Sequence, residues 1–120
     1  MGVSYEFGQK VDASPSLATK LYERACTMGN ADGCLSAGRM YEFHHGVDKD
    51  DAKAVALYGR ACDTGSAVGC ANLAIMLENG RGTPRDLPRA KKLYEDACAK
   101  GARMACERAT YLRGVIDAGN

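Results

Sequence analysis

Tryptophan is absent from this chain of 120 residues, and histidine and phenylalanine each occur only twice. A dominant charge is also missing, because 16 Lys and Arg face 15 Asp and Glu, for a formal net charge of +1. Without a basic surplus, no broad field attracts nucleic acid, and nucleic acid is not expected as a partner. No apolar run approaches the ~20 residues of a membrane-spanning helix. Membrane insertion is therefore not expected, and the first residues lack the basic and apolar regions of a signal peptide.

Cysteine, by contrast, is abundant, with six residues in so short a chain. Such density favours an oxidising compartment, so we expect a periplasmic or secreted protein. The hydrophobic content of 46% is enough for one continuous core. The length and composition predict one domain over residues 1–120.

A repeat of 36 residues organises the whole chain. Shifting the sequence by this period superposes both cysteine series without a gap, together with three Leu-Tyr pairs and three Gly residues. The same shift superposes three glutamates. The aligned positions are Cys26/Cys62/Cys98, Cys34/Cys70/Cys106, Leu21-Tyr22/Leu57-Tyr58/Leu93-Tyr94, Gly29/Gly65/Gly101 and Glu6/Glu42/Glu78. About three repeats are therefore predicted.

Each period is typical of two helices. The first has apolar residues at i, i+3, i+4 and i+7, as in Ala54, Leu57, Tyr58 and Ala61, and its tyrosine is expected in the core. Ser14, Asp50 and Asp86 are suited to capping these helices, and Gly29, Gly65 and Gly101 to ending them. The second helices are predicted over Asp32–His44, Val68–Asn79 and Met104–Ile116.

The two cysteines of a period lie eight residues apart, one at the end of a first helix and one at the start of a second. Repeat symmetry allows local pairs or pairs shifted by one period. The shifted scheme leaves two cysteines unpaired, so we favour Cys26–Cys34, Cys62–Cys70 and Cys98–Cys106. Two alternatives stay open at this point. Buried free thiols pack as small apolar groups, and zinc normally needs four ligands with closer cysteine spacing.

The repeat resembles the Sel-one-like repeat (SLR) family, in particular its cysteine-rich Helicobacter type. The resemblance rests on Lys53-Ala54-x-x-Leu57-Tyr58-x-x-Ala61-Cys62-x-x-Gly65-x-x-x-Gly69-Cys70-x-Asn72-Leu73, followed by Leu77-Glu78-x-Gly80-x-Gly82-x-x-x-Asp86. It implies an all-α, right-handed superhelix (solenoid) of helix-turn-helix repeats, similar to tetratricopeptide repeats. It also implies disulfides within each repeat and a role as a secreted adaptor or ligand binder.

Some SLR proteins are described as penicillin-binding proteins or weak β-lactamases, so a β-lactam hydrolase is the alternative function. The chain contains neither Ser-x-x-Lys nor Lys-Thr-Gly, the elements of serine penicillin-recognising enzymes. His44 and His45 are adjacent, and side chains about 100° apart on a helix do not readily chelate one ion. We therefore predict no catalytic residue, metal site or cofactor.

A binding surface is predicted where the repeats differ. Framework positions recur because they pack repeat on repeat, whereas a binding groove needs different side chains in each copy. One face of the second helices varies in this way, and such helices normally line the concave side of a solenoid. The predicted partner-binding residues are Ser36, Arg39, Phe43, Asn72, Ile75, Asn79, Arg108 and Tyr111, with Val115 in the same series. Neutral drift on a solvated face is the alternative explanation. The favoured function is a non-catalytic scaffold, an adaptor or an inhibitor, for a protein or peptide.

Overall fold

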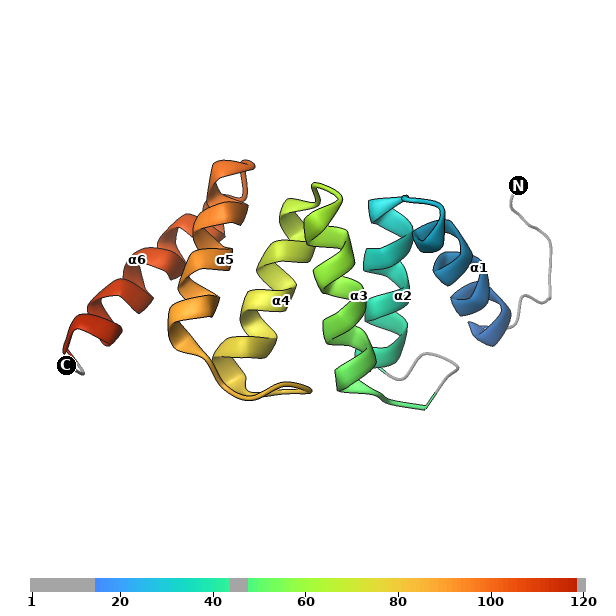
Figure 1. The fold of residues 1–120 in the computed structure, drawn as a ribbon, viewed down its shortest axis with the longest axis horizontal. Helices are drawn as coiled ribbons and strands as arrows, with labels where there is room; N and C mark the ends of the chain where they lie inside the picture. Colours follow the sequence, from blue (N-terminus) through green and yellow to red (C-terminus); the bar gives the residue numbers. More distant parts are fainter. Residues whose placement is uncertain (1–14, 44–47, 119–120) are drawn as a thin grey trace.

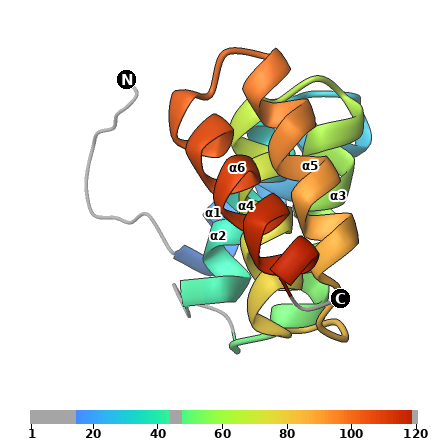
Figure 2. The same cartoon turned by 90° about the vertical axis from the view of Figure 1, so that its left-hand side faces the viewer.

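The computed structural model describes residues 15–43 and 48–118. These residues form helices and no strand: α1 (Pro15–Thr27), α2 (Ala31–Phe43), α3 (Asp51–Asp63), α4 (Ala67–Asn79), α5 (Leu87–Ala99) and α6 (Arg103–Ala118). Figure 1 shows them side by side in chain order, and Figure 2 shows the same stack from its end. The extents are 55 × 27 × 21 Å, so the predicted elongated helical repeat is confirmed. Within these residues, no helix combines the length and apolar character needed to cross a membrane.

The even helices begin one residue earlier than predicted. Asn30 and Ser66 explain the difference for α2 and α4, because each side chain accepts a hydrogen bond from the backbone N–H three residues on. The distances are 2.9 Å from Gly33 N to Asn30 Oδ1 and 2.9 Å from Gly69 N to Ser66 Oγ. These capping side chains make residues 31 and 67 the first helical residues. The C-terminal helix α6 extends two residues beyond the predicted Ile116, and His44 lies outside the described residues.

The caps of the odd helices follow the sequence. Asp50 and Asp86 each accept a hydrogen bond from the backbone N–H three residues later, as predicted. Ser14 lies outside the described residues. At the other ends, all three glycines have the positive φ of a helix terminator: Gly29 at 92°, Gly65 at 110° and Gly101 at 106°. Local sequence therefore determines where each odd helix turns into the next even one.

A disulfide closes each of these turns. The pairs are Cys26–Cys34, Cys62–Cys70 and Cys98–Cys106, with Cα atoms 4.4, 4.5 and 4.7 Å apart. No cysteine of the chain is free. The structure thus has the local pairing that the spacing favoured, rather than the shifted scheme.

The core lies between consecutive helices, and the tyrosine series departs from its predicted burial. Tyr58 and Tyr94 are fully buried, but Tyr22 in α1 is exposed, and Leu21 is 54% exposed where its equivalent Leu57 is 7% exposed. The reason is positional. An even helix packs against α3 and α5 from the N-terminal side, whereas the residues before α1 lie outside those described. The sequence-based expectation that all three tyrosines are core residues is therefore wrong for Tyr22 in the described residues.

Candidate functional site

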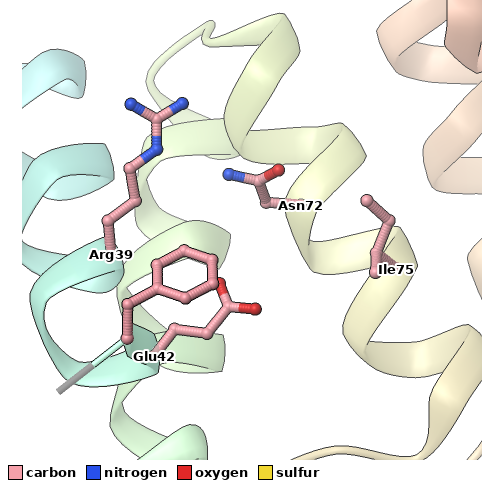
Figure 3. A pocket seen from close by; sticks show the side chains of 5 residues that line it. Arg39, Glu42, Asn72 and Ile75 are labelled. Carbon is pink, nitrogen blue, oxygen red and sulfur yellow. The ribbon is translucent and has the colours of Figure 1, made fainter.

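Two neighbouring cavities lie along the even helices. The first has a volume of about 340 Å³, and its lining comes from the last turns of α2 and the middle of α4. Figure 3 shows the side chain of Asn72 extending toward the guanidinium of Arg39, with Glu42 below them and Ile75 on the far side of Asn72. The lining residues are Arg39, Glu42, Phe43, Asn72 and Ile75.

The second cavity, of about 450 Å³, lies between α4 and α6 and is the more apolar of the two in its lining. Asn72 and Ile75 line both cavities, so the two spaces adjoin across α4. The residues that line it are Ala71, Asn72, Ile75, Glu78, Asn79, Tyr94, Met104, Ala105 and Arg108.

Most of the predicted partner-binding residues line the two cavities. Six of them line one or both spaces: Arg39, Phe43, Asn72, Ile75, Asn79 and Arg108. Ser36 and Tyr111 line neither. Tyr111 is exposed on α6, and its ring lies 4.6 Å from the guanidinium carbon of Arg108.

Two of the six are already occupied by contacts within the protein. The guanidinium of Arg108 forms an ion pair with Glu78. The side-chain amide of Asn79 donates a hydrogen bond of 3.0 Å to the carbonyl oxygen of Ile75, inside its own helix. Of the predicted polar residues that line the cavities, Arg39 and Asn72 are therefore the more available ones for a ligand.

Sequence reasoning did not select the two glutamates beneath this surface. The hydroxyl of Tyr58 donates to Glu42 Oε1 at 2.5 Å, and that of Tyr94 donates to Glu78 Oε1 at 2.8 Å. Both bonds span 16 residues and join an even helix to the next odd helix. The recurrence of Glu42 and Glu78 at 36 residues was the available signal, since a charged residue at a packing position needs a partner.

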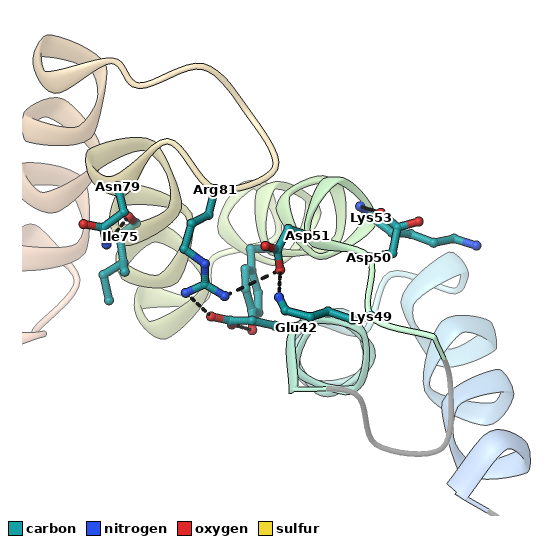
Figure 4. A network of polar contacts seen from close by, with 9 residues as sticks. Glu42, Lys49, Asp50, Asp51, Lys53, Ile75, Asn79 and Arg81 are labelled. Carbon is teal, nitrogen blue, oxygen red and sulfur yellow. Dashed lines mark hydrogen bonds and ion pairs between the residues drawn. The ribbon is translucent and has the colours of Figure 1, made fainter.

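Arg81, in the loop after α4, links two repeats. Its Nη1 atom lies 3.1 Å from Glu42 Oε2, and its Nη2 atom lies 3.5 Å from Asp51 Oδ1. Lys49 Nζ in turn lies 2.6 Å from Asp51 Oδ1 (Figure 4). The hydrogen bond from Lys49 lowers the pKa of Asp51, and the positive charge of Arg81 adds to the effect. Glu42, whose side chain is 9% exposed, is thus compensated by an arginine and a tyrosine hydroxyl.

The buried tyrosines predict loss of stability in alkali. Burial raises the pKa of Tyr94 to about 12, and burial with the hydrogen bond to Glu42 raises the pKa of Tyr58. Unfolded tyrosine ionises near pH ~10. Since the folded pKa values are raised, their stabilising effect is complete below pH ~10 and is lost as the pH rises through the folded values. We expect circular dichroism to show unfolding in this window, together with late phenolate absorbance.

Tyr94→Phe is the matched variant for this test, because it removes one hydroxyl that must ionise. Relative to its own stability at neutral pH, it should lose less stability in alkali than the parent protein. Equal losses in the two proteins would show that Tyr94 does not drive the transition.

Residues 15–43 and 48–118 contain no group of three or more His, Cys, Asp or Glu side chains that could hold a metal ion. His44 and His45 lie outside these residues. The polar groups that line the two cavities come from two arginines, two asparagines, two glutamates and one tyrosine, and the rest of the lining is apolar.

Comparison with known proteins identifies the repeat. The Sel1 repeat model matches residues 1–30, 31–66 and 67–101. Cysteine-rich protein B of Helicobacter pylori is 31% identical, with 74% of this chain and 67% of that chain covered and a TM-score of 0.72. No curated protein matches the chain.

Two longer solved structures share the fold. A Sel1 repeat protein from Oxalobacter formigenes is 24% identical, with a TM-score of 0.78 over 82% of this chain and 41% of that one. The c5321 protein, a protective antigen of uropathogenic Escherichia coli with an SLR fold, is 27% identical, with a TM-score of 0.77 over 81% and 21%. The chain therefore spans less than half the length of either protein.

Proposed function

Because this chain belongs to the Sel1 repeat family, we propose that it is a non-catalytic scaffold that binds a protein or peptide partner along α2, α4 and α6. The partner lies over the two adjoining cavities, and the scaffold acts as an adaptor or an inhibitor in the periplasm or outside the cell.

The observation that carries this proposal is the contrast between framework and cavity. Leu57, Tyr58 and Ala61 recur in every repeat and are buried in α3. Besides recurring residues such as Glu42 and Glu78, the cavities are lined by positions that change from copy to copy, as in Arg39 and its equivalent Ile75. Packing explains the recurring set, and the hollow lined by the variable set is what a ligand site requires.

The side chains that line the two cavities can bind a polypeptide. The amide of Asn72 can both donate and accept, so it can bind a peptide group between the two cavities. Phe43 and Ile75 are exposed beside it and offer apolar contact. A peptide in an extended conformation presents this alternation of backbone amides and side chains.

The three disulfides support an oxidising location. The similar Helicobacter pylori protein also has a name that records its cysteines. No observation on the described residues favours the β-lactam hydrolase considered from the sequence. Turnover of nitrocefin by the pure protein, abolished by one defined substitution, would reverse that assessment.

The test is a triple variant, Arg39→Ala with Asn72→Ala and Tyr111→Ala, assayed against a partner captured from the source extract and then purified. Loss of central arginine or aromatic anchors commonly costs ~2 kcal/mol, so calorimetry should show affinity about thirtyfold weaker or more. Exposed substitutions shift stability by less than ~0.5 kcal/mol, so the melting temperature should barely change.

The matched control carries Arg24→Ala, Arg60→Ala and Lys92→Ala on the exposed faces of α1, α3 and α5. It should keep the parent affinity. Unaltered affinity in the first variant would move the site to the odd helices, the loops or a chain end.

A further inference from the structure

Arg39 differs from Arg108, the other arginine that lines the cavities, and from Arg81, which contacts Glu42. Arg81 and Arg108 each form an ion pair with a glutamate of the repeat framework. No carboxylate of the described residues forms an ion pair with Arg39. Figure 3 shows its side chain extending away from Glu42 and toward the same space as Asn72. Its guanidinium can therefore donate hydrogen bonds to a carboxylate from outside the protein.

The other charges around the first cavity cancel. Glu42 and Asp51 carry two negative charges, and Arg81 and Lys49, which contact them, carry two positive charges. The hydroxyl of Tyr58, which contacts Glu42, is neutral at neutral pH, and burial raises its pKa further. The charge of Arg39 is left over, because Arg39 is the one charged side chain lining this cavity that forms no ion pair within the described residues.

The second cavity has no such surplus. Arg108 and Glu78 neutralise one another at its edge. Most of the remaining lining is apolar, including Ala71, Ile75 and Met104, and Met104 is 81% exposed. This cavity therefore suits an apolar side chain.

We propose that the scaffold prefers a segment of a partner protein in which an acidic side chain lies next to an apolar one, and that Arg39 determines the acidic position. The carboxylate enters the first cavity and forms charge-assisted hydrogen bonds with the Arg39 guanidinium. The neighbouring apolar side chain enters the second cavity. This specificity rests on the proposed function, since it uses the same surface.

Selection from a library of short random peptides displayed against the oxidised protein tests the preference. Enriched sequences should share one Asp or Glu beside a Leu, Ile, Met or Phe. Replacing the acidic residue of a selected peptide by Gln or Asn should weaken binding about tenfold or more, as expected for a hydrogen bond to a charged group.

Arg39→Gln should weaken binding of the acidic peptide by a similar factor, yet bind the neutral peptide as the parent protein does. Arg60→Gln, an exposed arginine on α3, should bind both peptides as the parent does. The four affinities of the parent and Arg39→Gln proteins for the acidic and neutral peptides form a double-mutant cycle. It isolates the interaction energy between Arg39 and the peptide carboxylate.

The outcomes separate the two proposals. Enriched peptides without a shared acidic residue, or an Arg39→Gln variant that still prefers the acidic peptide, overturn the role of Arg39 and leave the groove standing. Selected peptides that bind the Asn72→Ala, Ile75→Ala variant unchanged overturn the groove itself. Failure to enrich any peptide overturns both.

Discussion

Reduction of the three disulfides is expected to lower the melting temperature on the order of 20 °C. Each bridge closes a loop between cysteines eight residues apart, and the chain-entropy estimate for such a loop is ~2.5 kcal/mol. Three bridges together contribute about 7 kcal/mol, and a domain of this size shifts by a few degrees per kcal/mol. The helices should still form when cold, because their caps and apolar stripes are intact. Thermal melts with and without reductant measure the effect.

Removing single bridges separates chain entropy from packing. The Cys62→Ala, Cys70→Ala variant opens the central bridge, and Cys98→Ala, Cys106→Ala opens the last one. The loops are equally long, so chain entropy alone predicts equal losses. We expect the central variant to lose more, because Cys70 is fully buried while Cys106 is only half-buried. An unchanged melting temperature after full reduction would show that the bridges do not contribute to stability.

Gly82→Ala is expected to cost about 3 kcal/mol of unfolding free energy. Gly82 has a φ of 73°, which costs an alanine roughly 1 to 2 kcal/mol. A Cβ atom there would also lie 2.4 Å from the carbonyl carbon and oxygen of Asp51, in the first turn of α3. The loop would have to move, and overpacking adds about 1 to 3 kcal/mol. The same movement would pull Arg81 away from Glu42.

Gly80→Ala is the matched control for Gly82→Ala. Gly80 ends α4 with a φ of 68°, but its nearest new neighbour would be Arg85 Cβ at 3.4 Å, an ordinary contact. Both variants share the backbone penalty, so urea titration should show Gly82→Ala about 2 kcal/mol less stable than Gly80→Ala. Equal losses would mean that the close approach of the loop to α3 does not matter.

The elements that sequence reasoning predicted are those set by local spacing. The repeat of 36 residues predicted the helix pairs and the disulfide partners. Helix ends were predictable because the cap Asp50 and the terminator Gly65 act within one helical turn of their own positions. Asn30 and Ser66 act in the same local way. Recognising them as caps would have placed the starts of α2 and α4 at the observed residues.

The features that the sequence did not predict depend on contacts between residues far apart in the chain. The ion pair of Arg108 with Glu78 spans 30 residues, and nothing in the local pattern indicates that Arg108 is engaged while Arg39 has no carboxylate partner among the described residues. Tyr22 and Tyr58 occupy equivalent positions in the repeat, but the helix packed before each one decides its burial. Variation between repeats predicted a candidate surface, whereas the ion pairs of its charged residues required the three-dimensional arrangement.

The placement of the bridges also has a mechanical consequence. Every disulfide joins an odd helix to the even helix that follows it, and all six cysteines are used, so α2 to α3 and α4 to α5 have no covalent cross-link. A stretching force on the two ends would separate α2 from α3 and α4 from α5 first. Three helix hairpins, each closed by its disulfide, would remain. Each bridge would then withhold its eight-residue segment, ~28 Å of chain, from further extension. The three disulfides therefore limit the length to which the unfolded chain can be stretched.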